Sequence, residues 1–433
     1  MKHPLSHLNL LTLSAFVMAT AHAADPSFEI FSYTGKDLFP SAIISTATVD
    51  WSAFSEIGAE EADEEDQQFP VLGDPNAWLG VMLFDVPEEA KIKVEMSGEG
   101  WMKPSTFVGK AVTREGDPIQ GDLDVLPKGV WDYDVLRKVR EQKSVSLTVK
   151  VTIDGVELPE QTETFIMRSM NDCPFFIIAD EEDEEDEESG DVKDISWCFA
   201  AYVNENHPWI DGLLKEALAS AKDAEGKPLI GSFSGYQSGS SEEVLKQVFA
   251  IWQVLQRRGI QYSAVSTTVP SKTVVSQVVR FVDESIDAKQ ANSVDGSVLM
   301  ASILTKIGLH AYLVMIPGHC YLAFDEGAGG ETLIGLETTL LGQEKLKSIE
   351  DLKALQPKEG DKKLDMKKLN GMVSKEAEVS MKTFLNAIDS GNGKLDKFAE
   401  AFADASDPSI QIISITQWRK LGIMPLASGK EKQ

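Results

Sequence analysis

Hydrophobic residues alternate with polar residues in the first part of the chain. Asp154-Gly155 supplies the turn of a hairpin into the strand-like segment Val156–Phe165. The other strand-like segments are 28–33, 43–49, 79–84, 91–96 and 144–153. We expect about seven strands that form an antiparallel β-sandwich, interrupted by one helix over Asp132–Gln142.

The second part of the chain has mainly helical spacing. A helix is predicted after His207-Pro208, and Ser240 with Glu243 forms a capping box for a second helix that ends before Gly259. The first of these helices has an apolar stripe at Ile210, Leu213, Leu214, Ala217, Leu218 and Ala221. Residues 197–203 and 261–267 have strand character, whereas 274–282 fits both periods.

The most apolar stretch of the second part runs from 291 to 324. Residues 294–307 are apolar or small on nearly every side and stop at Gly308, a residue type that commonly ends a helix. Two short runs rich in branched and aromatic residues follow, 311–316 and 319–324, with Pro317-Gly318 between them. We therefore expect a buried helix followed by a β-hairpin whose second strand starts with His319.

The residues at the start of this helix and hairpin resemble a known family. Residues 292–296 read Asn-Ser-Val-Asp-Gly, 301–302 Ala-Ser, 317–319 Pro-Gly-His and 336–339 Leu-Glu-Thr-Thr. This order resembles the transglutaminase-like superfamily, in which the helix opens with a catalytic cysteine. Ser293 stands at the position of that cysteine, His319 at the position of the histidine and Glu337 at the position of the acid.

The resemblance implies a papain-like α+β domain over 196–428. It also implies that 274–282 is helical and that 410–415 is the closing strand. The charged segment 343–392 is expected to be an insert of surface helices. The whole chain is then an α+β protein, with the β-sandwich first and the transglutaminase-like domain second.

Replacement of the cysteine by serine changes the expected chemistry. A thiol ionises far more easily than a hydroxyl, so a site shaped for a thiolate and an imidazolium does not become a serine hydrolase by one substitution. Gln290 is the only side-chain oxyanion donor that the sequence suggests. The leading interpretation is an inactive binding or scaffold protein that holds a protein or peptide. The alternative is a hydrolase or acyltransferase that acts on amide or peptide bonds through Ser293, His319 and Glu337.

Each of these three residues also has a purely structural interpretation. Ser293 can cap the helix, His319 can bond a backbone carbonyl, and Glu337 can satisfy His319.

The first 23 residues have the features of a secretory signal. Lys2, His3 and His7 precede an uncharged run over 8–20, and Ala21-His22-Ala23 fits the cleavage rule. No later apolar run reaches the ~18 residues that a membrane helix needs. We expect a soluble mature protein, exported to the periplasm or the extracellular space.

The charge of the chain limits the partners and ligands that it is expected to bind. The net charge of −28 argues against nucleic acid, which requires a basic surface. The acidic runs 60–66 and 180–188 are expected to be solvated loops, because their like charges repel one another and stay hydrated. Calcium binding is the alternative, but neither run has the carboxylate spacing of a calcium loop. Asp389–Asp396 resembles an EF-hand loop only superficially, because Gly391, Gly393 and Lys394 occupy the wrong positions. No cofactor or metal is expected.

Three cysteines remain in a chain that is expected to be exported. Cys173 and Cys198 flank the second acidic run, and a disulfide between them would contribute about 3 kcal/mol in the chain-entropy model. Two buried free thiols are the alternative. Cys320 follows His319 on a strand, so we expect its side chain to point toward the core. The expected organisation is a signal peptide over 1–23, a β-sandwich over 24–172, an acidic linker over 173–195 and the second domain over 196–428.

Overall fold

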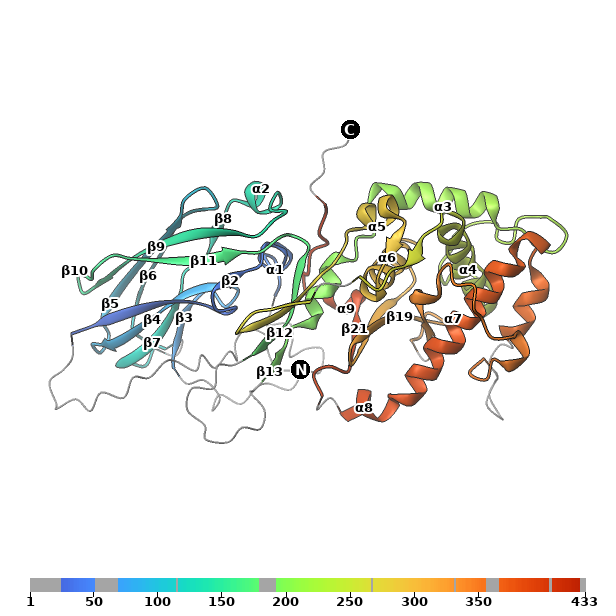
Figure 1. Ribbon diagram of the computed structural model, residues 1–433. Helices are drawn as coiled ribbons and strands as arrows, with labels where there is room; N and C mark the ends of the chain where they lie inside the picture. Colours follow the sequence, from blue (N-terminus) through green and yellow to red (C-terminus); the bar gives the residue numbers. More distant parts are fainter. Residues whose placement is uncertain are drawn as a thin grey trace.

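The computed structural model shows an α+β protein with two lobes (Figure 1). It describes residues 25–50, 69–113, 116–178, 192–265, 268–330, 332–355, 366–404 and 407–428. The expected signal peptide and both acidic runs lie outside these residues. Among the described residues, no helix is long and apolar enough to cross a membrane.

The first lobe contains two β-sheets around a shared core. The smaller sheet has the order β1 (Ser27–Ser32), β4 (Leu79–Val86), β7 (Gly121–Leu126), β3 (Val71–Gly73). The larger has the order β2 (Asp37–Leu38), β11 (Gln161–Met167), β9 (Lys143–Ile153), β5 (Lys91–Gly98), β6 (Met102–Lys110), β8 (Val130–Trp131), with β10 (Val156–Glu157) paired to β9. Pairing is antiparallel except at β2–β11 and β3–β7. Val81 and Leu83 of the smaller sheet and Val94 and Leu147 of the larger are fully buried in one cluster.

Two predictions for this lobe are wrong in detail. Residues 43–49 do not form a strand, because helix α1 (Pro40–Ser45) occupies the start of this segment and is buried along its whole length. Its proline is at the first turn, where the fixed φ angle favours a helix. The helix expected over Asp132–Gln142 is reduced to α2 (Tyr133–Leu136), which Asp132 caps.

A third sheet joins the two lobes. It has the order β13 (Val192–Asp194), β12 (Asp172–Ile178), β16 (Val274–Val278), β15 (Thr268–Pro270). The segment 173–195, expected to be a linker, thus contains β13 and nearly all of β12, and β12 pairs with β16 from the second half of the chain. Residues 274–278 are a strand rather than the helix that the resemblance implied, because they pair with β12 and β15.

The second lobe is built on the sheet β20 (Leu333–Leu336), β19 (His319–Asp325), β18 (Ala311–Ile316), β21 (Gln411–Ser414), which is antiparallel throughout. The helix predicted over 294–307 is α6 (Ser293–Lys306), followed by Gly308 at φ +81°. The predicted hairpin is also present, with Gly318 at φ +70° in its turn.

Other helices complete the second lobe. They are α3 (Pro208–Ser220), α4 (Ser241–Arg257), α5 (Val282–Ala288) and α9 (Ile415–Lys420), with short 3₁₀ helices η4 (Thr338–Leu340), η5 (Ile349–Asp351), η6 (Met366–Met372) and η7 (Lys375–Ala377). Residues 197–203, expected to be a strand, form the 3₁₀ helix η3 (Ser196–Tyr202). Of the described residues 261–265, also expected to be a strand, only β14 (Gln261–Tyr262) is one, and it pairs with β17 (Gln290–Ala291) just before α6.

The charged segment near the end of the chain does not consist only of surface helices. Helix α7 (Glu378–Lys397) buries Met381, Phe384, Leu385 and Ile388. Leu395 and Phe398, at the end of α7, and Phe402 of α8 (Ala399–Asp404) pack against the face of the central sheet that carries Tyr321. The opposite face carries Cys320 and Leu322 and belongs to the main core with α6. The central sheet therefore lies between α6 on one face and α8 with the C-terminal end of α7 on the other.

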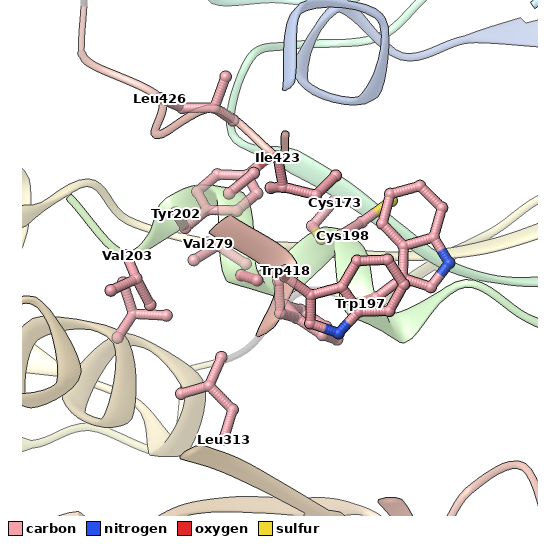
Figure 2. Packing of buried hydrophobic residues seen from close by; sticks show 14 of the residues in the cluster. Cys173, Trp197, Cys198, Tyr202, Val203, Val279, Leu313, Trp418, Ile423 and Leu426 are labelled. Carbon is pink, nitrogen blue, oxygen red and sulfur yellow. The ribbon is translucent and has the colours of Figure 1, made fainter. Parts of the chain in front are cut away.

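Aromatic side chains and the C-terminal segment fill the junction between the lobes (Figure 2). Trp197 and Trp418 are stacked with their ring centroids 5.1 Å apart, and the Tyr202 hydroxyl donates to the Met170 carbonyl at 2.9 Å. The C-terminal segment returns to the first lobe, where the Met424 amide donates to the Ser45 carbonyl at 2.9 Å.

Cys173 and Cys198 also lie in this junction (Figure 2). The disulfide expected between them is absent from the structure, in which both are buried free thiols. Burial raises the pKa of both thiols well above the ordinary value, so the thiolate needed for disulfide formation is disfavoured.

Candidate functional site

The start of helix α6 is held by a capping box. The Asn292 side chain accepts a hydrogen bond from the Asp295 amide at 2.9 Å, and the Asp295 carboxylate accepts from the Asn292 amide at 3.2 Å. The same carboxylate accepts from the Arg280 amide and from the Arg280 guanidinium, both at 2.8 Å. Burial raises the pKa of Asp295, and these hydrogen bonds and the Arg280 charge offset only part of that effect. Asn292 and Asp295 are therefore structural parts of the motif.

Ser293 is the first residue of α6 and is half-buried. Its carbonyl oxygen accepts from the Ser297 hydroxyl at 2.7 Å and from the Thr338 hydroxyl at 3.5 Å. This places the Ser293 backbone against the residue that follows Glu337. The Ser293 Oγ makes no hydrogen bond with His319 or with any other described residue.

His319 and Glu337 are in direct contact, as the sequence motif predicts. The His319 Nε2 lies 2.7 Å from the Glu337 Oε2. The other carboxylate oxygen of Glu337 accepts from the Thr339 amide at 3.1 Å and from the Thr339 hydroxyl at 2.7 Å. Since Nε2 donates its proton to the carboxylate, Nδ1 is the nitrogen of a neutral His319 that retains a lone pair.

Lys394 of helix α7 is a member of this site that sequence reasoning missed. Its ammonium forms an ion pair with the Glu337 Oε2, the same oxygen that accepts from His319. It also donates to the Ser390 hydroxyl at 3.3 Å and lies 5.5 Å from the centroid of the Tyr321 ring. No local pattern connects positions 337 and 394, so only the packing of α7 on the sheet reveals the contact.

Glu337 is ionised at neutral pH despite its burial. Its side chain is 3% exposed, and burial alone raises its pKa. The hydrogen bond from His319, the His319 charge and the Lys394 ammonium together outweigh burial and lower the pKa of Glu337 to about 2. The carboxylate is thus a fixed negative charge shared between two cationic or potentially cationic side chains.

Cys320 is not positioned as a nucleophile. Strand alternation turns it away from His319, and it is 1% exposed in the main core beside Ser297. Burial is the largest cause that raises the pKa of this thiol to about 12. Cys320 is therefore protonated at neutral pH.

Gln290 lies on β17 with an exposed side chain and makes no side-chain hydrogen bond. A small cavity of about 10 Å³ adjoins the first turn of α6, with Ala291, Gly296 and Thr338 in its wall. This volume suits about one water molecule. The cavity is therefore too small to hold a peptide side chain.

The part of the chain that the structure describes contains no group of three or more His, Cys, Asp or Glu side chains arranged to hold a metal ion.

No family model matches the chain, and comparisons with curated proteins and with solved structures find no match either. The interpretation of the site accordingly depends on its own geometry.

Proposed function

We propose that this chain is an exported transglutaminase-like protein without catalytic activity, which uses the region around Ser293 to bind a protein or peptide. The observation that carries the proposal is the state of position 293, where a hydroxyl replaces the family thiol and makes no hydrogen bond to His319. A serine nucleophile needs a general base within hydrogen-bond reach to remove its proton. The ion pair between Glu337 and Lys394 further supports the proposal, because the carboxylate oxygen that accepts from His319 also binds the Lys394 ammonium.

A serine-directed fluorophosphonate probe tests this proposal. The full-length protein is treated with the probe beside its Ser293→Ala variant and an active serine hydrolase. We expect labelling of the hydrolase alone. Labelling of the natural protein that disappears in Ser293→Ala would overturn the proposal.

The alternative function is hydrolysis or acyl transfer at amide or peptide bonds through Ser293, His319 and Glu337. The observation in its favour is the 2.7 Å contact between His319 and Glu337, which leaves Nδ1 of a neutral imidazole available as a base. The fluorophosphonate experiment distinguishes the two functions, because only the alternative requires an activated hydroxyl at position 293.

Binding is tested by selecting displayed random peptides against the full-length protein. We expect Ser293→Trp to lower the affinity of the protein for the selected peptides by tenfold or more, since a large side chain would cover the start of α6. Val379→Trp is the control, because Val379 is 68% exposed and lies at the start of α7. Equal loss in both variants, or in neither, would place the binding surface elsewhere.

Export is tested by N-terminal sequencing of the protein recovered outside the cytoplasm. Cleavage after Ala23 predicts that the mature chain starts at Ala24. An intact N-terminus in that fraction would contradict the proposed signal peptide.

A further inference from the structure

Helix α3 begins with a side-chain cap that a histidine provides. Pro208 is the first residue of the helix and has no N–H, so the Trp209 amide is the first amide that needs a partner. The Trp209 amide donates to the His207 Nδ1 at 3.3 Å, and the Ile210 amide donates to the His207 carbonyl at 3.0 Å. Because a backbone amide can only donate, Nδ1 carries a lone pair and the proton of a neutral His207 is on Nε2.

The other ring nitrogen of His207 faces helix α5. Its Nε2 lies 3.7 Å from the Asp283 Oδ1, and the two side chains are 11% and 9% exposed. Burial lowers the pKa of His207, and the charges of Asp283 and Asp287 offset only part of that effect. His207 is therefore neutral at pH 7, the state in which it caps α3.

The charged groups near His207 belong to three helices. Asp283 and Asp287 of α5 are the groups whose charges act on the pKa of His207, and both raise it. On α3 itself, Asp211 lies in the first turn, where it forms an ion pair with Lys306 of α6 at 3.5 Å. A proton that His207 gains is therefore attracted toward α5.

We propose that His207 is an acid-sensitive cap, which holds the start of α3 at neutral pH and forms an ion pair with α5 in acid. Protonation places a hydrogen on Nδ1, which can then no longer accept from the Trp209 amide. The imidazolium keeps its Nε2–H toward Asp283, and its charge is attracted to both carboxylates of α5. Proton uptake thus exchanges a hydrogen bond within α3 for an ion pair between two helices. The inference does not depend on the proposed function, because it involves neither Ser293 nor a bound peptide.

The direction of the pH effect follows from the lowered pKa of His207. Its value in the folded protein lies below the ordinary value of 6.5, so the folded protein binds fewer protons at this site than the unfolded chain. The stabilisation by the cap is fully present above pH 6.5 and is lost as pH falls through the folded value. An NMR titration of His207 should give a midpoint below 6.5, and a midpoint at or above that value would overturn the inference.

Amide hydrogen exchange of the full-length protein, followed by NMR in a series from pH 7.5 to pH 4, tests the loss of the cap. After correction for the intrinsic pH dependence of exchange, we expect the protection of the Trp209 amide to fall about fivefold as His207 is protonated, since a side-chain cap contributes an effect of this size.

The same molecule contains a matched control for this measurement. The Ser240 hydroxyl caps α4 by accepting from the Glu243 amide at 3.4 Å. A hydroxyl does not titrate in this pH range, so the protection of the Glu243 amide should stay constant. Equal changes at the two amides, or no change at Trp209, would overturn the inference.

Two variants assign the change to His207 and its partner. His207→Asn keeps a capping side chain that does not titrate, so the protection of Trp209 should become independent of pH. Asp283→Asn removes the nearest charge and should move the midpoint of the change at Trp209 to lower pH by about one unit. A pH-dependent Trp209 amide in His207→Asn, or a midpoint that stays constant or rises in Asp283→Asn, would overturn the inference. If Asp283→Asn does not fold, Asp287→Asn replaces it and should shift the midpoint less, in the same direction.

Discussion

Among single residues, Glu337 determines most of the electrostatics of the candidate site. Its carboxylate is buried, yet it accepts from His319, Thr339 and Lys394. Donors that bind the ionised form lower the pKa of a carboxyl group, so a carboxylate with this many donors remains ionised at pH values well below the usual pKa of glutamate. The stability of the second lobe should therefore depend on the protonation of one glutamate.

The pH dependence of this contribution has a definite sign. The pKa of Glu337 is about 2 in the folded protein and 4.5 for an unperturbed glutamate. Since the folded value is the lower one, the stabilisation is fully present above pH 4.5 and is lost as pH falls toward 2. A difference of 2.5 units corresponds to at most about 3 kcal/mol.

We expect Glu337→Gln to lower the free energy of unfolding by up to about 3 kcal/mol at pH 7, and the gap from the natural protein to close between pH 4.5 and pH 2. Urea denaturation at a series of pH values measures this difference. Glu378→Gln is the control, because Glu378 is exposed at the start of α7. A gap that does not change with pH would contradict the assignment of the stabilisation to the ionised carboxylate.

At the scale of elements, the start of α6 and the docking of α7 determine the geometry of the site. Asp295 is 1% exposed and connects α6 to the segment before α5 through Arg280. Removing one partner of a buried ion pair leaves the other partner uncompensated. Asp295 lies in the same first turn of α6 as Ser293.

We therefore expect Asp295→Ala to lower the free energy of unfolding by about 3–5 kcal/mol. Asp287→Ala, at an exposed position on the neighbouring helix α5, should change it by less than about 0.5 kcal/mol. Chemical denaturation of the two variants gives the comparison, and equal effects would mean that the capping box is not a main source of stability.

The contact between α7 and β20 offers a matched pair of glycines. Gly391→Ala should destabilise the protein by about 1–3 kcal/mol, because the added Cβ meets the backbone of Gly335. Gly393→Ala, two residues further along the same helix, meets nothing within 4 Å and should stabilise it by about 0.5–1 kcal/mol. Thermal denaturation of both variants tests the pair. The two substitutions are expected to change the melting temperature in opposite directions. A stabilising Gly391→Ala would contradict the close approach of Gly391 to Gly335.

At the scale of the whole molecule, the two lobes share structure that a division at residue 196 would separate. Strand β12 precedes that boundary but pairs with β16 beyond it. The C-terminal segment bonds back to the first lobe through Leu421 and Met424, and Leu426 is buried beside η3. The described parts of the chain therefore contain two lobes that are joined by a sheet and by a shared core.

A fragment that begins at Ser196 should not fold cooperatively, because β16 would lose β12 and the junction around Trp418 would be exposed to water. Differential scanning calorimetry should show a cooperative transition for the full chain and none for the fragment. A fragment that melted cooperatively at the temperature of the full chain would show that the second lobe is independent of the first.

The sequence by itself determined the elements whose signals are local. The small and apolar residues of 294–307, the glycine at 308 and the Pro-Gly turn predicted α6 and the hairpin correctly, since capping, helical periodicity and turn preference act over a few residues. The contact of His319 with Glu337 was expected only through the family resemblance of the motif residues.

Only the tertiary structure decided the features that depend on distant pairing. The sequence of residues 274–278 fits a helix and a strand equally well, and pairing with β12 makes it a strand. Helix α7 lies in the charged segment, yet one of its faces is buried in the core. The ion pair between Lys394 and Glu337 joins positions that share no local pattern. These contacts were not predictable because their stabilisation comes from burial and charge between segments that folding alone brings together.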